Sequence, residues 1–199
     1  RLQAWPLAMN RSAYLNLGSS PVVLALAAWA LVLNLDYSGV AGTWKYVPLL
    51  SALDLGQLFV LGTLFAWVRE QSRAKGSLYA VLGGLTFVWV SAGAARTVHH
   101  WLGVPFVWHT LVDSVALQAS WSILWTLLAL GLMIQATRRS LRTLWFAGFG
   151  LLGVVGLKLM LVDTAHVNTL GRTVSLLGVA LLVIAASYFA PTPPKASER

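Results

Sequence analysis

Cysteine is absent from the 199 residues, so the sequence excludes disulfide bonds and thiolate chemistry. Charged side chains are scarce: they make up 10% of the chain, against about 25% in an average soluble domain. Only six residues are acidic. Glycine-rich phosphate loops, nucleophile elbows and HExxH-type metal motifs are also missing. The sequence therefore contains no motif that names a reaction.

Apolar residues dominate the sequence instead. They make up 58% of the chain, and the mean hydropathy is +0.74. A helix needs roughly 20 apolar residues to cross the ~30 Å hydrocarbon core of a bilayer, and a helix pairs its own backbone polar groups there. We predict an all-α, polytopic transmembrane helix bundle of about six spans. These are Pro21–Leu35, Leu49–Val68, Leu78–Ala95, Ser114–Ala136, Leu144–Val162 and Thr169–Phe189.

The basic residues indicate the orientation of these spans. With six spans, ten of the fourteen lysines and arginines fall on one side of the membrane and four on the other. Cytoplasmic loops collect lysine and arginine, so both termini are expected in the cytoplasm. The same bias accounts for the net charge of +8 without a nucleic-acid partner. We expect residues 1–199 to form a single transmembrane helical domain with a flexible tail at 191–199. Because the first residue is Arg1, we also expect a piece of a longer polytopic protein.

Ionisable residues gather near the non-cytoplasmic ends of the predicted spans. Asp54 lies five residues into the second span, about 7 Å deep at ~1.5 Å per residue. Its side chain is too short to reach the headgroups, so it needs a cation or hydrogen-bond donors, which Lys158 or Arg172 could supply. Asp163 is expected to meet Arg172 across the short linker between the last two spans. Arg96 ends the third span. Lys158 and Arg172 could instead extend to the headgroups without a protein partner.

The fourth span carries a mixed polar and aromatic stripe. Gln118, Trp121, Ser122 and Trp125 follow spacings that place them on one helical face. Such a face suits lipid poorly, so we expect it to turn inward. It could serve helix packing, or it could line a polar cavity that belongs to a binding site.

Glycines recur at every third residue of the fifth span, at Gly150, Gly153 and Gly156. Small residues let the backbones of two membrane helices approach closely. We therefore expect this face to pack against a neighbouring helix.

Two adjacent histidines, His99 and His100, are weak candidates for metal ligands. Neighbouring residues on a helix point about 100° apart, so the two rings need not converge on one ion. The spacing of a recognised metal motif is absent from the chain. We predict no metal site and no cofactor.

The C-terminal half resembles the family called domain of unknown function 2339, which comprises predicted bacterial membrane proteins. The stretch KLMLVD at 158–163, followed by RTVSLLGV at 172–179, is similar to the family patterns K-L-F-L-V-D and R-x-x-S-F-L-x-L-G. The stretch PLLSALDL at 48–55 resembles P-L-L-N-P-L-D-L, with serine and alanine replacing Asn-Pro. The resemblance covers Tyr46 to Pro191. It implies a multi-pass protein of the bacterial inner (plasma) membrane, in a family whose members are generally longer and whose activity is not established.

Three functions compete at this stage. The first is binding or translocation of an anionic lipid-linked or envelope-derived molecule at an outer-leaflet polar site. The second is a structural or assembly subunit of a membrane complex. The third is an envelope lipid- or glycan-modifying enzyme with Asp54 or a histidine as general base. The expected partners are the lipid bilayer, an anionic lipid-linked ligand and other membrane subunits. The candidate binding residues are Asp54, Arg96, Gln118, Trp121, Trp125, Lys158, Asp163 and Arg172.

A fully paired, charge-neutral cluster of these residues would favour the structural function. An open cavity lined by the Gln118–Trp125 face would favour the other two.

Overall fold

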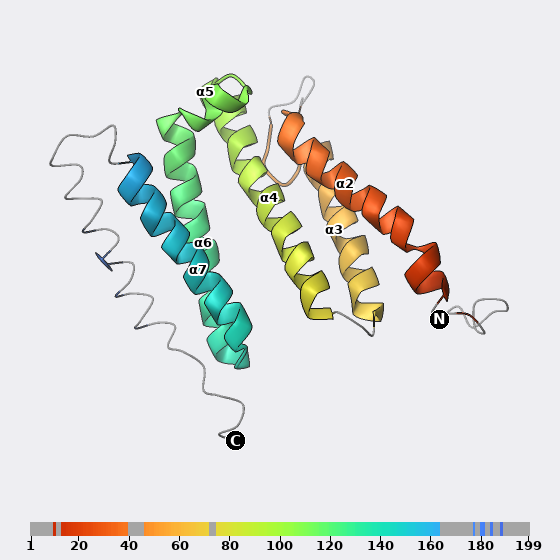
Figure 1. Cartoon of the computed structure of the whole chain (residues 1–199). Helices are drawn as coiled ribbons and strands as arrows, with labels where there is room; N and C mark the ends of the chain where they lie inside the picture. Colours follow the sequence, from red (N-terminus) through yellow and green to blue (C-terminus); the bar gives the residue numbers. More distant parts are fainter. Residues whose placement is uncertain are drawn as a thin grey trace. The chain divides into compact units, whose positions relative to one another are not determined.

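A computed structural model describes Asn10, residues 13–39, 46–71 and 75–163, and the positions 177, 180, 181, 184 and 188. Regular structure in these residues is entirely helical (Figure 1). The helices are η1 (Tyr14–Gly18), α2 (Ser20–Asp36), α3 (Ala52–Glu70), α4 (Lys75–Leu102), α5 (Trp108–Val112), α6 (Val115–Arg139), α7 (Arg142–Lys158) and η2 (Leu159–Asp163). η1 and η2 are single π-helical turns. The predicted tail at 191–199 lies outside the described residues, as does most of the sixth predicted span.

Four of the described helices are long and apolar enough to cross a membrane: α3, α4, α6, and α7 extended to Leu161. The 17-residue α2 is apolar but shorter. The all-helical, membrane-spanning architecture is thus as predicted, whereas the number of spans and the position of the termini stay predictions. The helix α4 is longer than the third predicted span and continues past Ala95 to Leu102. The second was predicted to begin too early, because α3 begins at Ala52.

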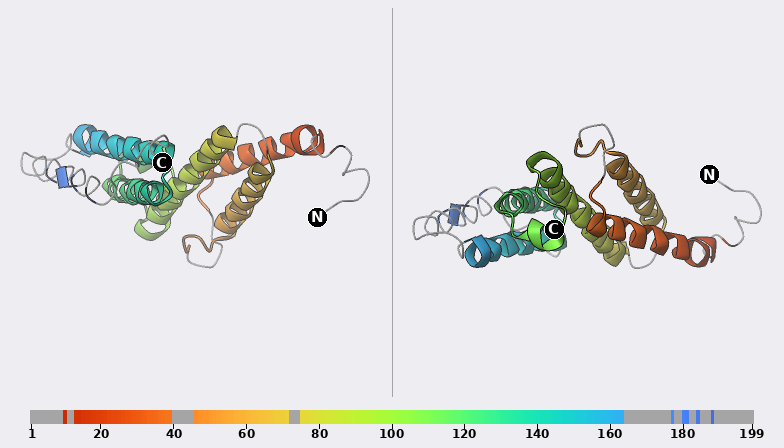
Figure 2. Two further views of the ribbon diagram at one scale, coloured as in Figure 1. Left: turned by 90° about the horizontal axis from the view of Figure 1, so that it is seen from below. Right: turned by 90° about the horizontal axis from the view of Figure 1, so that it is seen from above.

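The chain divides into two compact units between Val112 and Asp113. In unit 1, which ends at Val112, the helices α2, α3 and α4 contact one another (Figure 2). Their apolar core is formed by Ala30, Val60 and Leu64. At the end of α3, the indole nitrogen of Trp67 donates a hydrogen bond of 2.7 Å to Ser19 Oγ beside the start of α2. This contact and the core fix the direction in which α2 runs along α3.

Unit 2 contains α6 and α7, which form a closely packed helical hairpin. The core of the hairpin includes Ala129, Met133, Trp145 and Leu152. The two helices approach closely at Gly148. A Cβ atom added there would lie 2.7 Å from Met133 Cγ and 2.9 Å from the Ala129 carbonyl oxygen. α7 therefore packs on α6 through a glycine that the every-third-residue pattern did not select.

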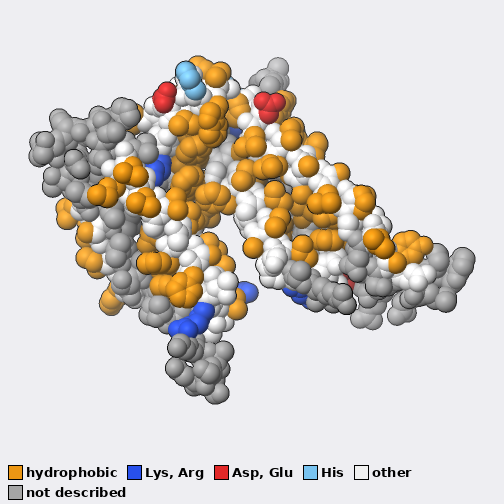
Figure 3. All heavy atoms as spheres, viewed as in Figure 1, with side chains coloured by type: hydrophobic (Ala, Val, Ile, Leu, Met, Phe, Trp, Pro, Cys, Tyr) orange, Lys and Arg blue, Asp and Glu red, His pale blue; other side chains and the backbone are white. Residues whose placement is uncertain are grey.

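The selected glycines Gly150 and Gly153 lie elsewhere on α7. A Cβ added at either position meets no atom of the described residues within 4 Å. Hydrophobic side chains also cover much of the visible surface of the helices (Figure 3). Phe59, Val115 and Leu127 are examples, each more than three-fifths exposed. Apolar side chains on the outside of span-length helices suit a surface that faces lipid.

Candidate functional site

The first turn of α3 holds the most strongly buried carboxylate of the described chain. Ser51 is the N-cap residue of α3, and its Oγ accepts a hydrogen bond of 3.0 Å from the backbone N–H of Asp54. The same hydroxyl donates to Asp54 Oδ2 over 2.9 Å. An acidic side chain in the first turn is also stabilised by the positive end of the helix. Local chemistry alone thus places the Asp54 carboxylate at the start of α3, pointing into unit 1.

Both oxygens of this carboxylate are occupied by donors. Asp54 is only 2% exposed. Its Oδ1 accepts hydrogen bonds from Arg96 Nη2 at 3.0 Å and from Trp89 Nε1 at 3.3 Å. Its Oδ2 accepts from Tyr46 Oη at 3.0 Å, from the Leu49 backbone N–H at 3.2 Å and from Ser51 Oγ. A carboxylate with five donors is well satisfied without water.

Arg96 is the cation of this site and is 0% exposed. Besides its 3.0 Å ion pair with Asp54, it donates from Nη1 and Nη2 to Asn34 Oδ1, each over 3.2 Å. Asn34 Nδ2 in turn donates to the Ala30 carbonyl oxygen at 2.9 Å, which also accepts from Gln57 Nε2 at 3.3 Å. We call this set the Asp54–Arg96 network. It joins α2, α3 and α4 through hydrogen bonds between buried groups.

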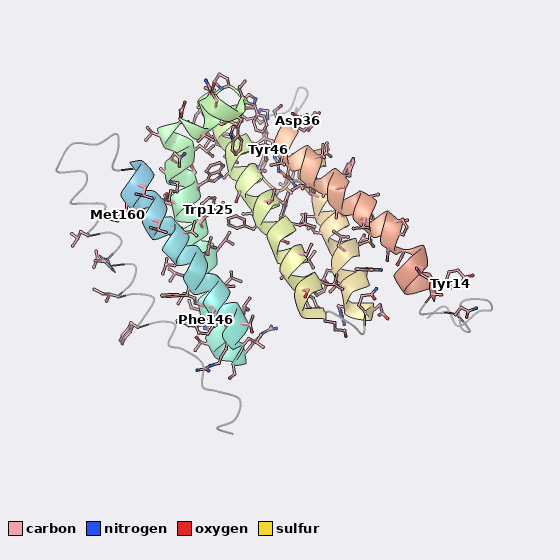
Figure 4. All side chains as sticks on the ribbon, viewed as in Figure 1. Tyr14, Asp36, Tyr46, Trp125, Phe146 and Met160 are labelled. Carbon is pink, nitrogen blue, oxygen red and sulfur yellow. The ribbon has the colours of Figure 1, made fainter. Side chains whose placement is uncertain are left out.

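Gly39 and Tyr46, which lie between α2 and α3, cover the network. Gly39 has φ +71°, and a Cβ added there would lie 3.0 Å from Arg96 Cδ. Tyr46 is almost fully buried, and burial raises the pKa of its hydroxyl, which keeps it a neutral donor to Asp54. Its ring stacks on His100, with centroids 4.7 Å apart, and its carbonyl oxygen accepts from Trp101 Nε1 at 2.9 Å. Figure 4 labels Tyr46 at this end of unit 1.

Unit 2 holds a second polar contact, between the beginning of α6 and the end of α7. Lys158 Nζ donates to Ser122 Oγ over 2.8 Å and to the Gln118 carbonyl oxygen over 3.0 Å. The lysine is half-buried and the serine is buried. Trp121 and Trp125, the latter labelled in Figure 4, are half-buried and stack on each other with ring centroids 5.6 Å apart. The Ser122 side chain of the predicted stripe therefore faces α7, and Gln118 contributes its backbone carbonyl oxygen to the same contact.

The structure brings only part of the predicted set together. Asp54 makes its ion pair with Arg96, a member of the predicted set, whereas the sequence had suggested Lys158 or Arg172 as its partner. Lys158 belongs to unit 2, Asp163 is the last residue of η2, and Arg172 lies outside the described residues. Their roles in binding stay predictions.

Sequence reasoning missed five partners of the Asp54–Arg96 pair, and three of them left a signal. Ser51 stands three residues before Asp54 at the start of an apolar segment, which is the spacing of a helix N-cap. Trp89 precedes Arg96 by seven residues, a spacing that puts both on one face of α4. A lone asparagine inside the apolar α2, Asn34, also indicates a buried polar contact. The contacts of Tyr46 and Leu49 depend on the path of a turn and left no pattern in the sequence.

The histidine pair gives no sign of a metal centre. His99 Nδ1 lies 2.7 Å from the Val104 carbonyl oxygen, and His100 Nε2 lies 2.9 Å from that of Ser38. Within the described residues, no group of three or more His, Asp or Glu side chains is arranged to hold a metal ion. Both histidines make backbone contacts that hold the end of α4 against the preceding and following segments.

The span-length apolar helices and the polar residues buried between them define a multi-pass α-helical membrane protein. The chain belongs to the family described as "Predicted membrane protein (DUF2339)", whose model matches residues 2–193. The match confirms the resemblance seen in the sequence and extends it on the N-terminal side of Tyr46. None of the curated proteins and none of the solved structures matches the chain.

Proposed function

We propose that this protein is a structural or assembly subunit of a membrane complex, in which the Asp54–Arg96 network holds α2, α3 and α4 in one arrangement. The observation that carries the proposal is the complete burial of an ion pair whose two charges cancel. All five donors to the carboxylate come from unit 1 itself.

The Asp54–Arg96 ion pair contributes more to the specificity of helix packing than to the net stability of the fold. A buried ion pair gains little over a well-packed apolar pair, because both charges must leave water. Its value is that any other rotation of α3 or α4 would leave a charge unpaired in a low-dielectric interior. Such a network selects one helix arrangement, which is the property that a subunit needs when it presents a fixed surface to neighbours.

The same geometry disfavours the enzymatic hypothesis at this position. A general base must reach a substrate proton within hydrogen-bond distance. Asp54 is 2% exposed, and both its oxygens already accept hydrogen bonds. Anion binding by Arg96 is disfavoured for a similar reason, because two of its nitrogens already donate to Asn34 and Asp54.

Single and double neutralisation of the pair tests the proposal. Asp54→Asn leaves the Arg96 charge buried without its counter-ion and should lower the free energy of unfolding by about 3–5 kcal/mol. The double variant Asp54→Asn/Arg96→Gln leaves no unpaired charge and should recover part of that loss. Asp36→Asn, at the exposed end of α2, is the matched control and should stay within about 0.5 kcal/mol of wild type. Reversible unfolding in detergent measures all three.

Complementation of cells that lack the protein distinguishes a structural role of these residues from a role in anion binding. A structural role predicts that Asp54→Asn lowers the amount of folded protein but leaves activity per folded molecule intact. If Lys158→Ala or Arg172→Ala abolishes complementation while the protein stays folded and abundant, the anion-binding hypothesis replaces ours. Equal stability of Asp54→Asn and wild type would also contradict the proposal.

A further inference from the structure

Three arginines surround the turn between α6 and α7. Arg138 and Arg139 are exposed in the last turn of α6, and Arg142 begins α7. Basic side chains are visible where the two helices meet at their lower end in Figure 3. The sequence has no aspartate or glutamate between positions 114 and 162, so the hairpin contributes no carboxylate to this end. The turn therefore presents concentrated positive charge.

These arginines are not required to cap α6. Ser140 adopts the left-handed conformation with φ +55°. Its backbone N–H donates to the carbonyl oxygens of Ala136 and Thr137, and the Leu141 N–H donates to that of Ala136 over 2.9 Å. The carbonyl groups of Ala136 and Thr137 in the last turn of α6 are thus paired by the backbone. The exposed guanidinium groups of Arg138 and Arg139 remain at the surface, beside the start of α7.

The start of α7 adds to this positive surface. The N-cap residue of the 17-residue helix is Leu141, whose side chain has no acceptor, and no acidic residue lies in its first turn. The first backbone N–H groups of a helix carry partial positive charge and favour a bound anion. The arginines remain the principal feature, because they supply full charges and bidentate donors.

The position of the turn identifies the kind of anion. α6 and the α7 segment to Leu161 are both long enough to span the bilayer, so the turn that joins them lies at the headgroup layer. Leu141 and Phe146, next to the arginines, are 48% and 60% exposed. Inorganic phosphate gains nothing from contact with apolar side chains, whereas the acyl chains of a phospholipid pack against them. We propose that the α6–α7 turn binds the phosphate of an anionic phospholipid through Arg138 and Arg139.

Lipid titration of the purified full chain tests this site. The unfolding temperature in detergent is followed against dioleoyl phosphatidylglycerol, dioleoyl phosphatidylcholine or inorganic phosphate, since a ligand that binds the folded state raises it. Each guanidinium that donates to the lipid phosphate adds a charge-assisted contact worth about tenfold in affinity, so Arg138→Gln/Arg139→Gln should weaken phosphatidylglycerol binding roughly 100-fold. Arg69→Gln/Lys75→Gln removes the same charge from exposed positions in unit 1 and should weaken it less than threefold.

Several results would overturn the proposal. Equal losses in the two double variants would show unspecific attraction to an anionic surface. Stabilisation by inorganic phosphate as strong as that by phosphatidylglycerol would exclude a lipid site, and so would equal effects of the two lipids. If the glutamine variant does not fold, Arg138→Lys/Arg139→Lys takes its place. It keeps the charge but loses bidentate contacts, and it should bind the anionic lipid more weakly than wild type but still in preference to phosphatidylcholine.

Discussion

Gly148→Ala should weaken the α6–α7 hairpin, whereas the same substitution at Gly150 should not. The new methyl group at position 148 would lie 2.7 Å from Met133 Cγ, 2.9 Å from the Ala129 carbonyl oxygen and 3.2 Å from Leu132 Cβ. The methionine side chain can move, but the backbone oxygen can move only with α6 itself. A relief of several tenths of an ångström therefore requires the two helices to separate.

The size of the effect follows from comparing the two variants. Alanine is favoured over glycine inside a helix by about 1 kcal/mol, and this gain applies equally at both positions of α7. Overpacking of a close contact costs about 1–3 kcal/mol, and it applies only at Gly148. Subtraction removes the helix-propensity contribution. Gly148→Ala should therefore be less stable than Gly150→Ala by about 1–3 kcal/mol.

Equilibrium unfolding of the two purified variants, followed by tryptophan fluorescence, measures this difference. Wild type is compared in the same detergent, and denaturant midpoints are converted to free energies only where all three share one slope. If Gly148→Ala proved as stable as Gly150→Ala, the close approach of α7 to the Ala129 backbone would be refuted.

Two further predictions concern unit 1 and the orientation of the chain. Gly39→Ala should destabilise the protein more than Gly103→Ala. Both residues have positive φ, but only at Gly39 would the new Cβ press on Arg96, with its Cδ 3.0 Å away. Thermal unfolding of the two variants checks this, and equal losses of stability would show that backbone strain is the sole cause. Ser140→Cys, in a chain without native cysteine, should react with a membrane-impermeant maleimide only after the cytoplasmic face is opened. Labelling of intact cells from outside would reverse the predicted topology.

The sequence predicts the class of fold well because a single physical requirement dominates it. Span-length apolar segments must be helical in lipid, and α3, α4, α6 and α7 each overlap a predicted span. Even the need of Asp54 for a partner follows from the depth of its short side chain in the apolar segment. These conclusions depend on the composition of each segment, which can be read from the sequence without knowing how the helices pack.

The identity of the partner does not follow in this way. Arg96, Lys158 and Arg172 all lie near the same predicted boundary, and the choice among them depends on how each helix is rotated and where it crosses its neighbours. The helix α4 continues beyond Ala95, and this extension carries Arg96 into the interior of unit 1. The close contact of α7 with α6 at Gly148 was not predicted for the same reason, since the sequence does not show which glycine of α7 faces α6.

The composition of the Asp54–Arg96 network also has a consequence for biogenesis. Its charged and polar groups are distributed over α2, α3 and α4, so none of these helices carries a complete set of partners into the bilayer alone. A charged residue opposes the insertion of a solitary helix, by about 2.5–3.5 kcal/mol when it lies at the helix centre, whereas Asp54 lies in the first turn of α3. During synthesis, α3 emerges before Arg96 has been made, so Asp54 is at first without its counter-ion. We therefore expect α3 to reach its final packing in the membrane only once α4 is available to supply Arg96.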